Sequence, residues 1–373
     1  MSIESELKKD GIEVTEKLDT LTVNTIAKSI AHRLCSTFPE FNLNEQDLFI
    51  KLSRINMYRA KVPNGMSEAN YFYKNSSIYF NREIPNEDLE EFAIHECIHY
   101  LQEKKDNKNN LLKLGQCNFA EFKAYGMGLN EAAVQLMTSK ILGIPNDSVK
   151  YYGIEFSTTS PSYYPMECAL VAQMAFLTGT TVLYESTLFS TDKFKEAFSS
   201  LTSEKVFLAI QNAIDIILYA EENIIKLNNK LQKIDDRNKK TDNIIKKIGA
   251  EKKKISLTFM RTQNLIISSY FDTEFNKIYS LEKLENYRKK LSEFKKYLGI
   301  AEGYTFYNEY YFNKMTDLEK KYNALENGGL ETALYSIAKK ENKFITLLKA
   351  IKKLFSKSAT NNEYDYIQNK SGR

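Results

Sequence analysis

The segment from Ala93 to Tyr100 carries two of the chain's three histidines, His95 and His99. A spacing of four residues places both imidazoles on one face of a helix, one turn apart. Glu96 stands beside the first histidine in the pattern HExxH, which predicts a zinc site with this glutamate as the general base. Catalytic zinc takes three protein ligands and keeps a fourth position for water, so one more ligand must come from elsewhere in the chain.

Residues 126–132, with the sequence Gly-Met-Gly-Leu-Asn-Glu-Ala, resemble the second motif of the gluzincin metallopeptidases. In that family the Asn-Glu-Ala segment opens a helix whose glutamate completes the zinc site, so the resemblance implies that Glu131 is the third ligand. It also implies a zincin-like catalytic core, Zn²⁺ as the cofactor, and a peptide or protein substrate. The resemblance covers about residues 55–180 and does not reach the C-terminal helices.

The chain departs from the thermolysin-like branch of that family at two points. Gln135 stands where an aspartate orients a zinc histidine, although its amide oxygen can still accept an imidazole N–H. No histidine remains for the far wall of the site, because His32 falls in the leading helix and is expected to be structural or exposed. Tyr163 and Tyr164 are candidates to stabilise the oxyanion through a phenolic hydrogen bond; the alternative is that they cap the core.

Two other glutamates compete with Glu131 for the role of third ligand. Glu121 lies in a plausible segment and Glu167 begins a helix after Pro165, but neither is embedded in Asn-Glu-Ala. Cys97, two residues after the first histidine of the motif, is expected to face away from the metal and to serve packing.

The elements that position these residues follow from the spacing of apolar side chains. Aliphatic residues predict a leading helix over about 14–36, ended by Phe38-Pro39. Alternating aromatics over 55–81 predict a strand, a turn and a second strand. The resemblance to zincins implies that Tyr71–Tyr73 or Ile78–Phe80 supplies an edge along which extended peptide binds. Three more helices, separated by polar loops, are expected at about 87–104, 129–143 and 166–177.

Nearly everything after about residue 192 is predicted to be helical. Ten residues at alternating steps of three and four predict the seam of a helical hairpin or weak coiled coil: Ile224, Leu227, Leu231, Ile234, Asn238, Thr241, Ile245, Ile248, Lys252 and Ile255. Amphipathic helices continue to Phe355, with breaks at Gly299, Gly303 and Gly328-Gly329.

We therefore expect a predominantly α-helical α+β protein with a small antiparallel sheet. Its expected parts are an N-terminal helical segment (1–43), a zincin-like metallopeptidase domain (44–200), a helical domain with a coiled-coil-like hairpin (201–356) and a disordered tail (357–373).

The composition of the chain limits the classes of partner that we expect. A net charge of +4 with 27% charged residues does not call for nucleic acid, and the lysine runs are expected to be solvated helix faces. The sequence shows no apolar run long enough to span a bilayer and no secretory h-region, so a cytoplasmic location is expected. The four cysteines form no CxxC pair, which argues against a zinc ribbon or a disulfide framework.

The function that these features predict is zinc-dependent hydrolysis of peptide bonds, with Glu96 as general base. The main alternative is a zincin-scaffold binding or regulatory protein with little or no peptidase activity, which engages a protein partner through its helical half. A third possibility is a helical structural or oligomerisation protein with an incidental site.

Overall fold

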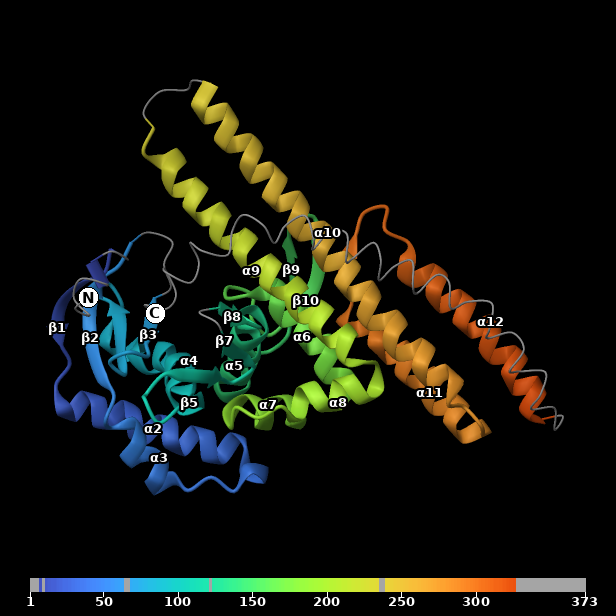
Figure 1. Ribbon diagram of the computed structural model, residues 1–373, viewed down its shortest axis with the longest axis horizontal. Coiled ribbons are helices and arrows are strands. Elements are labelled where there is room, and N and C mark those ends of the chain that lie inside the picture. Colours follow the sequence, from blue (N-terminus) through green and yellow to red (C-terminus); the bar gives the residue numbers. More distant parts are fainter. Residues whose placement is uncertain (1–6, 9–10, 64–67, 121–122, 235–238, 327–373) are drawn as a thin grey trace.

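The protein is predominantly helical with three small β-sheets, which confirms the expected α+β class (Figure 1). The computed structural model describes residues 7–8, 11–63, 68–120, 123–234 and 239–326. The expected tail and the break at Gly328-Gly329 lie outside these residues. Among the described residues, no single helix is both long and apolar enough to cross a membrane. Two neighbouring helices, α6 (Pro165–Thr178) and α7 (Thr180–Leu188), reach the required length only together, and they are bent by 113° at their junction.

The first sheet supplies one wall of the site. Its four strands lie in the order β1-β2-β4-β3 and span Glu13–Lys17 (β1), Asn56–Lys61 (β2), Ala69–Phe72 (β3) and Ser77–Asn81 (β4). The expected antiparallel pair is confirmed for β3 and β4, but β2 runs parallel to β4, so the prediction of a purely antiparallel sheet was wrong. The reason is that the segment joining β2 to β4 contains β3, which takes the outer position and lets the two flanking strands run in the same direction.

Two helices, α2 (Thr20–Thr37) and α3 (Glu45–Leu52), lie between β1 and β2 in the sequence. The start of the leading helix was predicted too early, because residues 13–17 pair with β2 as a strand. Asp19 begins α2 instead, since its carboxylate accepts hydrogen bonds from the N–H and the hydroxyl of Thr22. The helix ends at Phe38, before Pro39, as predicted.

The HExxH segment lies in α4 (Leu89–Gln102), which packs on β3 and β4. The Asn-Glu-Ala segment lies in α5 (Met127–Leu142), which ends at Gly143 in the left-handed conformation that glycine accommodates without strain. The third expected helix is α6 (Pro165–Thr178), followed by α7 (Thr180–Leu188) and α8 (Lys193–Leu201). All three helices predicted around the site are therefore confirmed. Each end lies within two residues of its predicted position.

Two small sheets occupy places where polar loops were expected. One has the order β5-β6-β7-β8, with strands Glu103–Lys105, Leu111–Leu114, Cys117–Ala120 and Lys123–Tyr125. The other has the order β11-β10-β9, with strands Ile300–Ala301, Ile154–Thr158 and Asp147–Tyr151. These strands are two to five residues long and mostly half-exposed, so they lack the long apolar alternation by which strands are found in a sequence.

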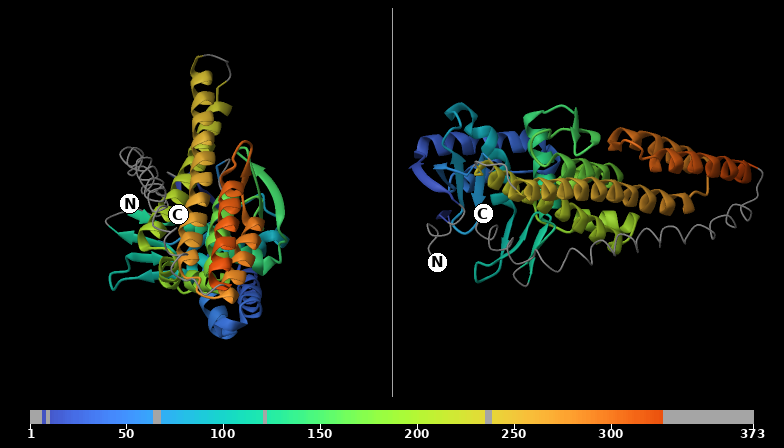
Figure 2. Two further views of the ribbon diagram at one scale, coloured as in Figure 1. Left: turned by 90° about the vertical axis from the view of Figure 1, so that its right-hand side faces the viewer. Right: turned by 90° about the horizontal axis from the view of Figure 1, so that it is seen from above.

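The C-terminal half is built on a hairpin of two long helices, α9 (Glu204–Gln232) and α10 (Lys239–Asn276), whose outer ends project beyond the body of the molecule (Figures 1 and 2). The predicted hairpin is confirmed, but its seam was wrong on α10: Ile245 and Lys252 are exposed, while Ile248 and Ile255 are buried. Thr241, Ile248 and Ile255, which are seven residues apart, are all buried, so only one of the two predicted rows of α10 is covered. Asn238 lies outside the described residues.

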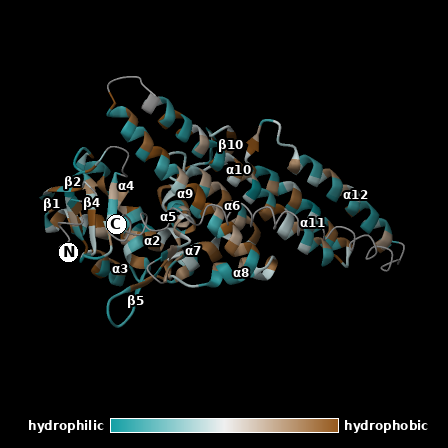
Figure 3. Cartoon of the chain, turned by 45° about the horizontal axis from the view of Figure 1, so that its top comes forward, coloured by the Kyte–Doolittle hydropathy of each residue, from teal (hydrophilic) through white to brown (hydrophobic). Residues whose placement is uncertain are grey.

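Two further helices, α11 (Leu281–Phe294) and α12 (Phe306–Glu326), pack beyond α10 (Figure 2). One hydrophobic cluster runs from Val23 in α2 to Leu318 in α12, so the core is continuous across residue 200. Figure 3 shows hydrophobic residues gathered where α5, α6 and α9 meet. Within this core, 14 of the 16 residues of α5 are buried, which makes it the central helix of the protein.

We predict that replacing Gln263 in α10 weakens the packing of this helix against α6 and against the segment at Gly299. Its side-chain oxygen accepts from the N–H of Gly299 and from Gln173 in α6, and its amide donates to the carbonyl of Gly299. Gln263→Leu leaves these buried groups without that partner, which costs about 1–3 kcal/mol for each. Gln173 still donates to the carbonyl of Tyr297, so the two backbone groups of Gly299 lose their partner, and urea unfolding is expected to give a free energy of unfolding lower by about 2–6 kcal/mol. Gln232→Leu, at an exposed position of α9, is the control; an equal loss in both variants would contradict the prediction.

Candidate metal centre

Helix α4 presents its two histidines side by side. The Nε2 atoms of His95 and His99 are 3.0 Å apart, and their rings meet edge to face with centroids 4.7 Å apart. His99 is buried and His95 is nearly so, with 13% of its side chain exposed. The four-residue spacing therefore does what the sequence predicts: it directs both imidazoles to one point.

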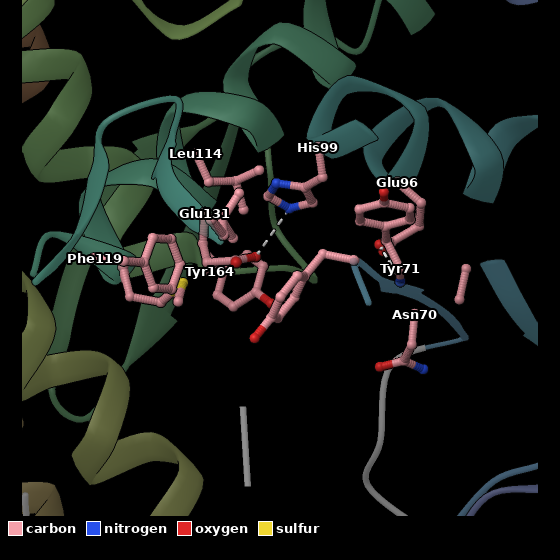
Figure 4. A pocket seen from close by; sticks show the side chains of 12 residues that line it. Asn70, Tyr71, Glu96, His99, Leu114, Phe119, Glu131 and Tyr164 are labelled. Atoms are coloured by element: carbon pink, nitrogen blue, oxygen red, sulfur yellow. Dashed lines mark hydrogen bonds and ion pairs between the residues drawn. The ribbon is translucent and has the colours of Figure 1, made fainter. Parts of the chain in front are cut away.

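Helix α5 brings a carboxylate to the same point. The Oε2 atom of Glu131 lies 3.4 Å from Nε2 of His95 and 3.6 Å from Nε2 of His99. Each of these three residues offers one ligand atom, and the three atoms lie within 4.8 Å of one another. Figure 4 shows Glu131 and His99 directed at each other across the gap between the two helices.

The Nδ1 atom of each imidazole, which faces away from Glu131, contacts the side-chain amide of a glutamine. Nδ1 of His95 lies 3.0 Å from Oε1 of Gln135, and Nδ1 of His99 lies 3.2 Å from Oε1 of Gln102. Asn130 also donates to Gln102 and accepts from a backbone N–H of the β6–β7 turn, which connects the second sheet to the site. An amide oxygen can only accept, so this placement favours the tautomer that carries its proton on Nδ1 and directs its lone pair from Nε2 to the centre of the group.

This arrangement fits a zinc ion. Two imidazole nitrogens and one carboxylate oxygen converge, and a cation between them would bind all three atoms at once. Two nitrogens and one oxygen are also the donor set of many catalytic zinc sites. Tetrahedral zinc with bonds near 2.1 Å sets its ligand atoms roughly 3.4 Å apart, which matches the separations of Glu131 from both histidines.

Glu96 lies next to the two histidines without belonging to their group. Its Oε2 accepts a 2.7 Å hydrogen bond from the backbone N–H of Tyr71 in strand β3, as Figure 4 shows. The Tyr71 hydroxyl in turn donates to Glu103, just beyond the end of α4, at 2.8 Å. Strand β3 thus fixes the orientation of the carboxylate that the sequence predicts to be the base. Cys97 is fully buried on the opposite side, and this burial raises the pKa of its thiol, in keeping with its expected packing role.

The two candidate tyrosines are in different places. Tyr164 lines the pocket beside the histidines, and its ring stacks on His95 with centroids 6.2 Å apart. Its backbone is left-handed (φ 51°, ψ 43°) directly before Pro165, a conformation that costs a bulky residue roughly 1–3 kcal/mol. Tyr163 is not among the residues that line this pocket; burial raises the pKa of its hydroxyl, as do the carboxylates of Glu68 and Glu91.

The pocket has a polar and an apolar side (Figure 4). Its empty volume is about 620 Å³, including the opening to solvent. The apolar side consists of residues that the sequence analysis did not select: Leu111, Leu114, Phe119 and Met127. The first three come from the second sheet; two short apolar runs separated by Gly115-Gln116 are the hairpin signal that would have indicated them.

The other predicted candidates lie elsewhere. Glu167 is fully buried at the start of α6, in surroundings that include Tyr152 and Glu221; burial raises the pKa of Glu221 to about 7, and burial together with these two carboxylates raises the pKa of Tyr152. Within the described residues, Glu131 is the carboxylate that joins the two histidines. Glu121 lies outside the described residues. His32 is exposed and contacts Glu45 at 3.1 Å, as expected for a residue outside the site.

We predict that Glu131→Gln weakens zinc binding, because a charged ligand is replaced by a poorly coordinating amide of the same size. The dissociation constant, measured by competition with a chromophoric chelator, should rise by more than the roughly 10–100-fold expected for loss of an outer hydrogen-bond partner. Glu87→Gln, at an exposed position before α4, is the matched control. Unchanged zinc binding in Glu131→Gln would transfer the ligand role to another carboxylate, with Glu167 and Glu121 next to test.

Comparisons with protein-family models, with curated proteins and with solved structures gave no match to this chain. The resemblance to gluzincins therefore rests on the motif residues alone. The convergence of His95, His99 and Glu131, in contrast, is a property of the structure itself.

Proposed function

We propose that this protein is a zinc-dependent hydrolase of peptide bonds. The observation that carries the proposal is the meeting of two imidazoles and one carboxylate, two of which, His99 and Glu131, line a cleft together with Glu96. His95, His99 and Glu131 would hold the zinc. When bound there, zinc supplies Lewis-acid chemistry, polarising a carbonyl and lowering the pKa of water.

Glu96 is the general base of the proposed reaction. Its carboxylate accepts a hydrogen bond from the Tyr71 N–H and lines the pocket, where it can accept a proton from the attacking water. The same carboxyl group then donates that proton to the leaving amine. A fixed orientation favours this transfer, because proton transfer requires the two heavy atoms to be within hydrogen-bonding reach.

Tyr164 is the proposed donor to the oxygen that gains negative charge during attack. It lines the same pocket as Glu96 and Glu131, and it stacks on His95. Strained backbone conformations concentrate at functional sites, and the left-handed conformation of Tyr164 supports a role that requires this placement. A phenolic hydrogen bond would be strongest to the developing oxyanion, which is where it lowers the barrier.

Strand β3 supports a peptide as the substrate. It is the last strand in the order β1-β2-β4-β3, and three of its residues, Ala69, Asn70 and Tyr71, line the pocket. The Tyr71 N–H is directed at Glu96, away from β4, so this side of the strand faces the cleft. An extended peptide can bind such an edge through its backbone, while the apolar side of the pocket suits an apolar side chain.

We predict that Glu96→Gln abolishes most of the peptidase activity while zinc stays bound. The amide oxygen can still accept from the Tyr71 N–H, so the fold is preserved, but the amide cannot take the proton. With a peptide library as substrate, kcat should fall by about 10²–10⁴-fold at unchanged zinc content. Glu91→Gln, at an exposed position of the same helix, should behave as wild type.

The same experiment distinguishes the alternative function. A zincin-scaffold binding protein would retain zinc in both variants and show no chelator-sensitive cleavage even as wild type. Full activity in Glu96→Gln would instead remove the assignment of this residue as the base.

Tyr163 and Tyr164 are neighbours in the chain, but only Tyr164 lines the pocket, so the same substitution can be compared at both. Tyr164→Phe removes the hydroxyl in the pocket and should lower kcat by about 10²–10³-fold with little change in KM, because the hydrogen bond forms chiefly in the transition state. Tyr163→Phe removes a hydroxyl outside the pocket lining and should leave both constants unchanged. Equal effects of the two substitutions on steady-state kinetics would exclude a specific role for Tyr164.

A further inference from the structure

The N-terminus of α5 is capped by a residue from the C-terminal half of the chain. Helix α5 begins after Gly126, which has no side chain with which to cap it. Asp215, a buried residue of α9, accepts hydrogen bonds from the N–H groups of Gly126 and Gly128, both at 2.8 Å. A carboxylate is well suited to this place, since the first turn of a helix presents unpaired N–H groups and the positive end of the helix dipole.

The two helices also touch backbone to backbone at this point. A Cβ atom added to Gly128 would lie 3.0 Å from the carbonyl oxygen of Ile214, the residue before Asp215. A Cβ atom added to Gly126 would lie 2.2 Å from the side-chain nitrogen of Gln211, one turn earlier on α9. The backbones of α5 and α9 therefore approach closely where the two helices meet, and a methyl group on Gly128 would require Ile214 to shift (Figure 1).

Glu131 is three residues after Gly128, on the next turn of the same helix. Its distances to the two histidines, 3.4 and 3.6 Å, depend on how far α5 is advanced along its axis and how it is rotated about that axis. The two hydrogen bonds of Asp215 restrain both, because they hold two N–H groups of the first turn by the two oxygens of one carboxylate. The histidines belong to α4 and are not restrained in this way.

We propose that Asp215 is a positioning residue for the metal centre, so that the helical hairpin sets the geometry of the third ligand. This inference rests on the proposed zinc site. Asp215 belongs neither to the three possible ligands nor to the residues that line the pocket; it acts through the backbone of α5, on Glu131 and on its neighbour Asn130. The hairpin root is thus part of the scaffold of the site.

The test compares zinc affinity in full-length variants of Asp215 at a temperature where circular dichroism shows each of them folded. Asp215→Ala should raise the zinc dissociation constant by about 10–100-fold, the range typical for outer residues that orient metal ligands. Asp215→Asn keeps one acceptor and should give a smaller rise. The visible absorption of bound Co²⁺ should change in both variants, because it reports the arrangement of the ligands.

The control is Asp19→Ala, which removes the cap of α2, a helix that carries no ligand. It should lower thermal stability and leave both the zinc dissociation constant and the Co²⁺ spectrum as in wild type. If Asp215→Ala does not fold, Asp215→Asn and Gly128→Ala take its place, the latter because its added methyl group pushes α5 against Ile214.

The outcomes separate this inference from the proposed function. Folded Asp215 variants with the zinc affinity and Co²⁺ spectrum of wild type would overturn the positioning role while leaving the zinc site intact. A wild-type chain that binds no zinc would overturn the proposed function itself, and the positioning role with it.

Discussion

The site depends on one constraint: three hydrogen-bond acceptors meet in a largely buried place. The lone pairs of two imidazoles and one carboxylate point at each other across about 3.0–3.6 Å. A cation between them would join all three groups, and each group is held on its outer side. Gln135 and Gln102 fix the two rings, and the cap by Asp215 fixes the helix that carries Glu131. Preorganisation of this kind is what a metal site requires.

The character of these outer contacts is itself informative. Carboxylates commonly orient zinc histidines, whereas here both partners are neutral amides. Among the described residues, Glu131 brings a carboxylate to the imidazoles, whereas the partners of both Nδ1 atoms are uncharged. A less negative surround leaves a bound cation more electrophilic, which suits the polarisation of a carbonyl.

The central position of α5 joins the two halves of the chain. Buried on nearly all sides, it contacts α4, α6, α7 and α9. The division of the chain into domains at residue 200 stays a prediction, but the hydrophobic cluster crosses that point without interruption. The helical half is thus attached to the site by both packing and hydrogen bonds.

The sequence alone predicted the features that depend on local spacing. Four residues place His95 and His99 on one helical face, and apolar periodicity located α4, α5, α6 and the α9–α10 hairpin. The short strands of the second and third sheets escaped, because they are formed by pairing with other strands and carry little pattern of their own. The early start of α2 failed for the same reason, since residues 13–17 are held by β2.

Only the tertiary structure decided which remote residues meet. It brought Glu131, and not Glu167, to the histidines, and Tyr164, and not Tyr163, to the pocket. It also revealed Asp215, which stands 84 positions beyond Glu131 in the chain and belongs to no motif. Spacing within a helix fixes which face a residue occupies, but contacts between helices depend on how complete side chains pack, and that information is distributed over the whole chain.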